Sequence, residues 1–393
     1  VLQQVENFNS PTETQNDSFK SVSKYFDRIT RPEQILSSLP QAINTMLDPA
    51  ECGPAVISMS QDVQGEAYDY PEIFFEEKIH EIRRIYPDPN QIKKAAEKLK
   101  KSKKPIIISG GGVLYSEAEK EISDFAIKHN IPVTATVMGI GCMKKDNPYY
   151  ISAIGCLGEG SSNNLATDTD LALAVGTKLG DFTTGSWTNF ENENFQLVSI
   201  NTSRFDTTKH RATPVVSDAK VGLKELSKEL GEWKAPNDWY NRALEERDNW
   251  DAYVTKESGP TNQELPSYAH AVGAVYRNAD PSDIVVTAAG GLVGEVVQIW
   301  KPKELNTFET EWGFSCMGYE ISGALGIKMA KPDQDVIVFV GDGSYLLQNS
   351  DIYSSIMYDK KLIIIVCDNG GHMVINRLQL AKGGKEYLCN FRS

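Results

Sequence analysis

The fold is decided by the stretch Val-Ile-Val-Phe-Val-Gly-Asp-Gly-Ser, residues 336–344. Its apolar run predicts a buried strand, and the pattern from Ser344 to Tyr358 predicts a helix after the Gly-Asp-Gly turn. A second predicted strand, Leu362–Cys367, ends just before Asp-Asn-Gly-Gly. Strand, helix and strand in this order form a βαβ unit, whose two strand-ending loops lie at the same edge of a parallel sheet. We therefore expect Asp342 and Asn369 to approach each other.

The two loops carry residue types that suit a diphosphate and a hard divalent cation. Gly341 and Gly343 let the backbone approach a ligand closely, and the N-terminus of the predicted helix offers N–H groups and a positive dipole end to an anion. The Asp342 carboxylate, the Asn369 amide oxygen and a backbone carbonyl near Gly371 are oxygen ligands of the kind that Mg²⁺ prefers. Either motif alone is more often a plain turn, but the shared layout of strands and helix favours one binding site.

The rest of the chain also alternates strands with helices, which predicts parallel sheets covered by helices. The expected helices are 32–47, 116–129 (with Ser116 and Glu119 as a capping box), 266–278 and 321–330, and the expected strands are 55–59, 106–108, 131–136, 171–175, 197–200 and 284–287. Polar stretches at Gln64–Pro89 and Lys234–Asp251 are interpreted as linkers. The fold class is therefore α/β, with three doubly wound parallel-sheet domains at 1–75, 76–235 and 236–393, the first and last of them truncated.

Composition disfavours several classes of protein. Forty basic against 53 acidic residues give a net charge of -13, which makes a nucleic-acid-binding surface improbable. No apolar run approaches the roughly 20 residues that a membrane-spanning helix needs. The six cysteines form no C-x-x-C pair and the five histidines do not cluster at metal-ligand spacing. We expect a cytoplasmic protein that binds neither nucleic acid nor membrane, and a chain that begins at Val1 as a fragment.

The Gly-Asp-Gly and Asn-Gly pattern resembles the metal and diphosphate motif of thiamine-diphosphate enzymes. Ser315–Glu320, followed by a helix of small residues, is similar to the segment that supports the bent cofactor in that family. The resemblance implies that Met317 props the two rings and that the carbonyl near Ser315 accepts a hydrogen bond from the aminopyrimidine. On its own, Met317 is equally well a gap-filling core residue.

The same resemblance implies the other cofactor contacts. The loop with Gly290, Gly291 and Leu292 is implied to meet the diphosphate, together with Gly341, Asp342, Gly343 and Ser344. A plain structural loop is the simpler alternative for residues 290–292. Gly110-Gly111-Gly112 resembles the opening of the middle domain, but Tyr115 stands where a dinucleotide fingerprint has its third glycine.

The family implies thiamine diphosphate and Mg²⁺ as cofactors, with Asp342, Asn369 and Gly371 at the metal. Its essential glutamate is expected upstream of Val1, so no established catalytic residue is expected in this chain. His372 is a candidate for moving a proton, the alternative being a loop histidine exposed to water. The resemblance also implies that 1–75 ends the pyrimidine-binding domain, that 236–393 binds the diphosphate, and that the active site lies between subunits of a homodimer or homotetramer.

Three stretches decide which branch of the family the chain resembles. Ile29–Gln34, Gln61–Asp69 and Ser315–Glu320 look like the trihydroxycyclohexane-1,2-dione hydrolases of myo-inositol degradation. This resemblance implies hydrolytic ring opening of the cyclic dione to 5-deoxy-glucuronate. The alternatives are a carboligase or decarboxylase of acetohydroxyacid-synthase type acting on pyruvate, and a non-catalytic fragment or binding module. No G-x-S-x-G motif is present to suggest a serine hydrolase.

Overall fold

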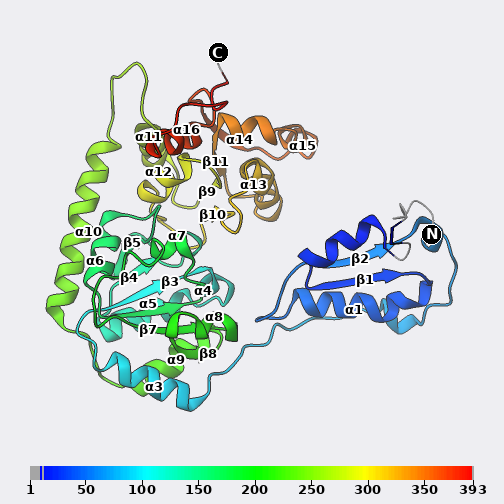
Figure 1. The fold of residues 1–393 in the computed structure, drawn as a ribbon, viewed down its shortest axis with the longest axis horizontal. Helices are drawn as coiled ribbons and strands as arrows, with labels where there is room; N and C mark the ends of the chain where they lie inside the picture. The colour runs from blue at the N-terminus through cyan, green and yellow to red at the C-terminus, as the bar shows by residue number, and fades with distance from the viewer. Residues whose placement is uncertain (1–8, 11–12, 392–393) are drawn as a thin grey trace. The chain divides into compact units, whose positions relative to one another are not determined.

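The structure is a computed structural model that describes residues 9–10 and 13–391 (Figure 1). It divides into two compact units. The first unit runs to Tyr86 and includes Thr202–Arg204, and the second comprises Pro87–Asn201 and the chain from Phe205 onward. Over the described part of the chain, no helix combines the length and the apolar character needed to cross a membrane.

The first unit is built on a parallel pair of strands, with 3-10 helices labelled η. Its elements are η1 Gln15–Val22, β1 Tyr25–Ile29, η2 Pro32–Gln34, α1 Ile35–Met46, β2 Ala55–Met59, α2 Gln61–Gln64 and η3 Glu72–Phe75. The predicted helix 32–47 and strand 55–59 are confirmed, whereas β1 was not predicted because its sequence Tyr-Phe-Asp-Arg-Ile includes two charged residues. Asp27 within β1 accepts a hydrogen bond from Ser38 of α1, which satisfies its carboxylate beside the helix.

The second unit begins with a six-stranded parallel sheet in the order β5-β4-β3-β6-β7-β8. Its elements are α3 Pro89–Leu99, β3 Pro105–Ser109, α4 Gly111–Tyr115, α5 Glu119–His129, β4 Val133–Ala135, η4 Val137–Gly139, β5 Tyr150–Ala153, α6 Gly160–Asp168, β6 Leu171–Val175, α7 Asp181–Thr184, β7 Gln196–Asn201, α8 Arg204–Thr208, η5 Lys209–Arg211, β8 Thr213–Val216, α9 Ala219–Leu230 and α10 Asn237–Glu257. Asp88 and Asp218 cap α3 and α9 by accepting N–H groups of the first turn.

Helices cover both faces of this sheet, as the doubly wound prediction requires. Ile107 of β3 packs with apolar residues of α3, α5 and α9 on one face. Ile106 and Ile108 point to the other face, where α6 and α10 contribute to a second cluster. The α/β class with parallel, helix-covered sheets is therefore confirmed, and the domain boundaries at 75/76 and 235/236 stay predictions.

The Gly110-Gly111-Gly112 run lies where β3 and β6 are adjacent. A Cβ atom on Gly112 would lie 2.6 Å from the Gly176 Cα, and one on Gly110 would lie 2.4 Å from the Gly176 carbonyl oxygen. These glycines are needed because two backbone segments pack directly against each other.

The predicted helix 116–129 is confirmed from Glu119 to His129, but its start at Ser116 and its capping box are wrong. Ser116 is the C-cap residue of α4, and α5 begins only at Glu119 without a side-chain cap. The Ser116 hydroxyl instead accepts the N–H of Ala219 at 3.4 Å, and the Glu119 carboxylate accepts from Asn306 at 3.0 Å. Ser116 and Glu119 match a capping box in sequence, but both side chains hydrogen-bond to residues that are distant in sequence and not to the helix end.

The predicted linker Lys234–Asp251 is also wrong, because most of it forms α10. Only Trp239 and Ala243 of this 21-residue helix are buried, so its apolar pattern is faint. The Trp239 indole N–H donates to the Pro105 carbonyl at 2.8 Å, which fastens α10 to the middle sheet. Strands β5 and β8 were not predicted, β8 containing a proline, Pro214.

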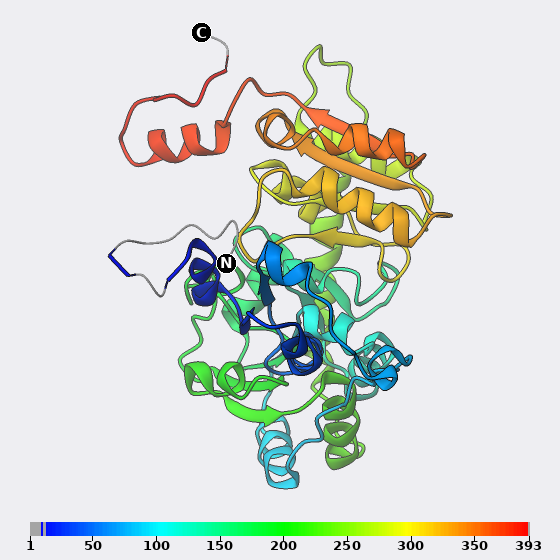
Figure 2. The ribbon, with the colours of Figure 1, turned by 90° about the vertical axis from the view of Figure 1, so that its right-hand side faces the viewer.

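The chain then forms a four-stranded parallel sheet in the order β10-β9-β11-β12, shown in yellow to orange in Figure 2. Its elements are α11 Tyr268–Asn278, β9 Ile284–Thr287, α12 Leu292–Ile299, β10 Phe308–Thr310, α13 Tyr319–Ala330, β11 Val336–Gly341, α14 Asp342–Leu347, α15 Asp351–Met357, β12 Ile363–Cys367 and α16 Met373–Ala381. All predicted strands here are confirmed. The predicted helix 344–358 is wrong as one element, because Gln348 leaves the helical region at φ -145° and Asn349 and Ser350 favour helix ends.

Candidate functional site

Loops and the first turns of helices at one edge of the four-stranded sheet carry every cofactor-site residue that the sequence predicted. They follow β9 (Gly290, Gly291, Leu292), β10 (Ser315, Met317), β11 (Asp342, Gly343, Ser344, after Gly341 at its end) and β12 (Asn369, Gly371, His372). All strands of the sheet are parallel, so their carboxyl ends share one edge. The chain reverses its direction of winding between β9 and β11, and such a switch point is where open α/β sheets bind ligands. We call these segments the four-loop edge.

The register of β11 and β12 brings two of the predicted metal ligands, Asp342 and Asn369, close together. Gly341 pairs with Cys367 in the β11–β12 ladder, so the residues just after them, including Asp342 and Asn369, emerge side by side. The Asp342 carboxylate is half-buried, and among the described residues none forms a hydrogen bond or ion pair with it. A half-buried carboxylate without a protein partner is suited to a cation.

The other two predicted metal ligands are already engaged with the backbone. The Asn369 amide oxygen accepts the Gly371 N–H at 3.2 Å, and the Gly371 carbonyl accepts the Met373 N–H at 3.0 Å. Each of these oxygens has a second lone pair that a metal ion could use. No three His, Cys, Asp or Glu side chains of the described chain gather into a metal site, so any site here rests on one carboxylate, an amide and a carbonyl.

Gly343, Met317 and His372 converge between the loops. A Cβ atom on Gly343 would lie 2.8 Å from the His372 Nδ1 and 3.4 Å from the Met317 Cε. The His372 ring packs edge-on against Phe391, with 4.8 Å between ring centroids, so it is not a freely exposed loop histidine. Met317 keeps 38% of its surface exposed, so it is not a core residue in this structure.

The loop with Gly290, Gly291 and Leu292 can contact a ligand through its backbone rather than through side chains. Gly290 has a φ of +80°, in the left-handed region that favours glycine, and it is exposed. A Cβ on Gly291 would lie 3.0 Å from the Val374 Cγ2, which brings α16 next to this loop. The Leu292 side chain is 3% exposed and packs in the core, so only its backbone is available to a ligand.

A carboxylate that the sequence analysis did not single out, Glu311, shapes the turn that carries Ser315. Its Oε1 accepts the Phe314 N–H at 2.9 Å and its Oε2 accepts the Cys316 N–H at 2.6 Å. Ser315 itself has a φ of +54°, which is uncommon for a residue with a side chain, and its hydroxyl donates to the Ala288 carbonyl at 3.4 Å. The turn after β10 is thereby held against the loop after β9.

Two further residues join the four-loop edge without any sequence signal of their own. The Tyr268 hydroxyl of α11 accepts a hydrogen bond from the Asn369 side chain. Glu320 lies fully buried at the start of α13 and accepts N–H groups from two of the loops. Both residues belong to segments interpreted only as a helix and a cofactor-supporting block, and spacing does not reveal which way a side chain points.

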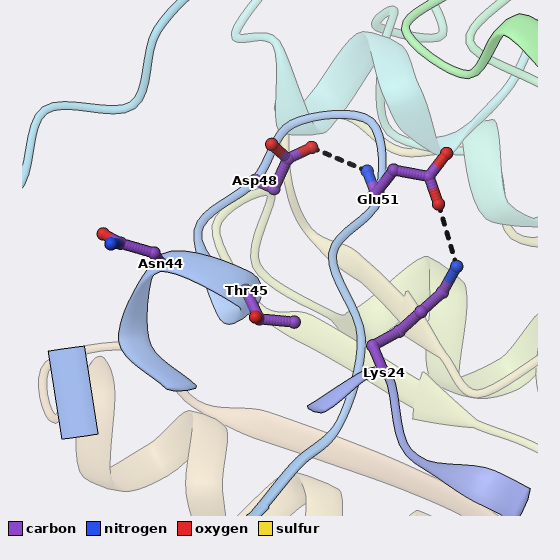
Figure 3. Close-up of a pocket in the computed structure, with 5 residues that line it drawn as sticks. All are labelled: Lys24, Asn44, Thr45, Asp48 and Glu51. Carbon is purple, nitrogen blue, oxygen red and sulfur yellow. Dashed lines mark hydrogen bonds and ion pairs between the residues drawn. The ribbon is translucent and has the colours of Figure 1, made fainter. Parts of the chain in front are cut away.

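A separate concavity of about 390 Å³ lies in the first unit (Figure 3). It is lined by Lys24, Asn44, Thr45, Asp48 and Glu51. The Lys24 ammonium pairs with Glu51 at 2.9 Å, and the Asp48 carboxylate accepts the Glu51 N–H at 2.7 Å. The Thr45 hydroxyl donates to the Gln41 carbonyl at 2.9 Å, outside the lining, and none of the predicted site residues lines the concavity.

Comparison with known families agrees with this geometry. Residues 92–226 match the thiamine pyrophosphate enzyme central domain, and residues 288–392 match the thiamine pyrophosphate enzyme C-terminal TPP binding domain. The chain belongs to the thiamine pyrophosphate enzymes. The resemblance drawn from the Gly-Asp-Gly and Asn-Gly loops is thereby confirmed, and all four loops of the four-loop edge lie within the second match.

Individual members of the thiamine pyrophosphate enzyme family align with the whole chain. Proteins named 3D-(3,5/4)-trihydroxycyclohexane-1,2-dione hydrolase from Bacillus licheniformis and Clostridium tetani are 40% and 38% identical to it and cover 100% of its length. One with the same name from Halalkalibacterium halodurans is 38% identical. The chain spans about 65% of the length of these relatives.

Proposed function

We propose that the four-loop edge binds thiamine diphosphate and Mg²⁺. The observation that carries this proposal is the convergence, at one sheet edge, of an amide oxygen, glycine backbone and a half-buried carboxylate that has no partner among the described residues. Asp342, Asn369 and the Gly371 carbonyl would hold the cation, since these hard oxygen donors suit Mg²⁺. Gly290, Gly291, Leu292, Gly341, Gly343 and Ser344 would surround the diphosphate.

The chain's own side chains would orient the cofactor and the substrate. Met317 would support the bend of the cofactor from the turn after β10, and the Ser315 carbonyl would accept a hydrogen bond from its amino group. His372 would hold or move a proton at its imidazole ring, which Phe391 keeps in place. When bound, the cofactor supplies an electron sink for breaking a carbon-carbon bond.

We propose further that the whole protein is a hydrolase of trihydroxycyclohexane-1,2-dione, which it opens to 5-deoxy-glucuronate in inositol degradation. The support is the name shared by the relatives at 36–40% identity, which align over the full chain. Family members act as oligomers, and we propose that this protein does so too, as a homodimer or homotetramer.

The test of this function compares two substrates. The full-length protein, loaded with Mg²⁺ and thiamine diphosphate, is assayed with trihydroxycyclohexane-1,2-dione and with pyruvate. We expect acid formation from the dione and no carbon dioxide release or acetolactate formation from pyruvate. Turnover of pyruvate with an inert dione would instead favour the carboligase alternative.

A further inference from the structure

A buried carboxylate, Glu320, lies where two loops of the four-loop edge meet the start of α13. None of its surface is exposed. Helix α13 packs over β9 and β11, because its Ile321 and Ala324 share a cluster with Val286 and Val338. The first turn of α13 is therefore fixed above the switch point between β9 and β11, with Glu320 beneath the loops that follow these strands.

The two oxygens of Glu320 contact different segments. Oε1 accepts the N–H of Ala289, just before Gly290, at 3.2 Å. Oε2 accepts the N–H of Gly318, just after Met317, at 2.9 Å. The Ser344 side chain at the start of α14 faces the same carboxylate and lowers its pKa. One side chain thus links the segments that follow β9 and β10, and it lies beside the segment that follows β11.

The charge of Glu320 is balanced without an ion pair. Within the described chain no Lys, Arg or His forms a salt bridge with it, and its hydrogen-bond partners are the backbone N–H groups of Ala289 and Gly318. Burial raises the pKa of this carboxyl, and these hydrogen bonds oppose the rise. The Ser344 side chain faces this carboxylate, so the start of α14 lies beside the group that holds the other two segments.

We propose that Glu320 is a positioning residue that ties the Gly290 loop, the Met317 turn and the start of α14 into one cofactor cradle. It does not touch the cofactor, and it acts by setting where the backbone of these loops stands. The proposal rests on the proposed binding of thiamine diphosphate at the four-loop edge.

A first test needs no cofactor. In the full-length protein, Glu320→Gln keeps the shape of the side chain but turns a donor toward one of the two buried N–H groups. Glu309→Gln is the matched control, because burial also raises the pKa of the half-buried Glu309, whereas its carboxyl faces the Tyr319 side chain and accepts none of the loop N–H groups that Glu320 holds. Hydrogen exchange should speed up in peptides covering 288–291, 313–319 and 341–345 for Glu320→Gln only. Unchanged exchange in all three peptides would overturn the linking role, whatever the enzyme does.

A second test measures the affinity of the variants for thiamine diphosphate. By calorimetry with Mg²⁺ present, Glu320→Gln should bind thiamine diphosphate about tenfold or more weakly, since a buried donor loses its acceptor. Glu309→Gln should stay within about threefold of the wild type. Equal losses in both variants, or unchanged affinity in Glu320→Gln and Glu320→Ala, would overturn the proposal. A wild type that binds no thiamine diphosphate would refute the proposed function instead, and the exchange experiment would still decide the linking role.

Discussion

The Tyr268 hydroxyl accepts a hydrogen bond from the side-chain amide of Asn369, which joins the first turn of α11 to the loop after β12. Because the amide nitrogen is engaged by Tyr268, the amide oxygen is left to face the Gly371 N–H and any cation. Burial raises the Tyr268 pKa, so the phenol stays neutral. The orientation of a proposed metal ligand is therefore set by a residue from a distant helix.

Tyr268→Phe should weaken binding of thiamine diphosphate in the presence of Mg²⁺ by about three- to tenfold, because Asn369 loses its orienting partner. The matched control is Tyr276→Phe on the same helix, which removes a hydroxyl that donates to the Lys301 carbonyl at 2.9 Å. Titration calorimetry on the full-length protein distinguishes them. Similar affinities for the two variants would contradict the orienting role.

Asp342→Ala should abolish most Mg²⁺-dependent binding of thiamine diphosphate, with a loss of about a hundredfold or more, since it removes the only charged metal ligand proposed. Asp333→Ala, an exposed position before β11, serves as the control. The affinity is measured by calorimetry with and without Mg²⁺. An Asp342→Ala variant with wild-type affinity would show that the cation is held elsewhere.

Gly343→Ala should disturb the cradle more than the fold. Its Cβ would lie 2.8 Å from the His372 Nδ1, so the ring or the loop must move. Gly326→Ala on α13 is the comparison, because a Cβ there meets nothing within 4 Å and alanine favours helix. We expect weaker cofactor binding only for Gly343→Ala, while the melting temperature of Gly326→Ala should equal or exceed that of the wild type. Unaltered cofactor affinity in Gly343→Ala would contradict the close approach.

The raised pKa of the buried Glu159 carboxyl leads to a prediction of how the stability of the fold depends on pH. Burial raises its pKa to about 8 from an ordinary 4.5, despite the Lys301 ammonium at 3.4 Å. The folded state keeps a proton that the unfolded chain releases. The stability that this carboxyl contributes is therefore fully present below the unfolded pKa, and it is lost as pH rises through about 8. Glu159→Gln should therefore gain melting temperature over the wild type between about pH 5 and pH 9. Glu245→Gln, exposed on α10, should show no such trend.

Much of the fold could be predicted because its strands are apolar and its loops carry distinctive residues. The apolar strands Val336–Gly341 and Ile363–Cys367, with a helical pattern between them, indicated a parallel sheet with a binding edge, although that pattern forms the two helices α14 and α15. Helix α10 could not be predicted from periodicity, since most of its residues face solvent. Its contact to Pro105 is made through a single indole.

The candidate site was predictable only in its loops. The glycines, Asp342 and Asn369 could be predicted from their residue types and spacing. The contacts of Glu320 and Tyr268 depend on how distant segments pack, so they could not. Glu320 reaches Ala289 across 31 positions of sequence, and Asn369 reaches Tyr268 across 101. Contacts between residues so far apart in sequence cannot be predicted from a local pattern.

The most direct measurement is a crystal structure of the full-length protein with thiamine diphosphate and Mg²⁺. We predict a cation at about 2.0–2.1 Å from oxygens of Asp342, Asn369 and the Gly371 carbonyl, with the diphosphate beside Gly290 and Gly343. Met317 should contact the bend of the cofactor. A diphosphate bound away from the four-loop edge, or a cation held by other residues, would contradict the account.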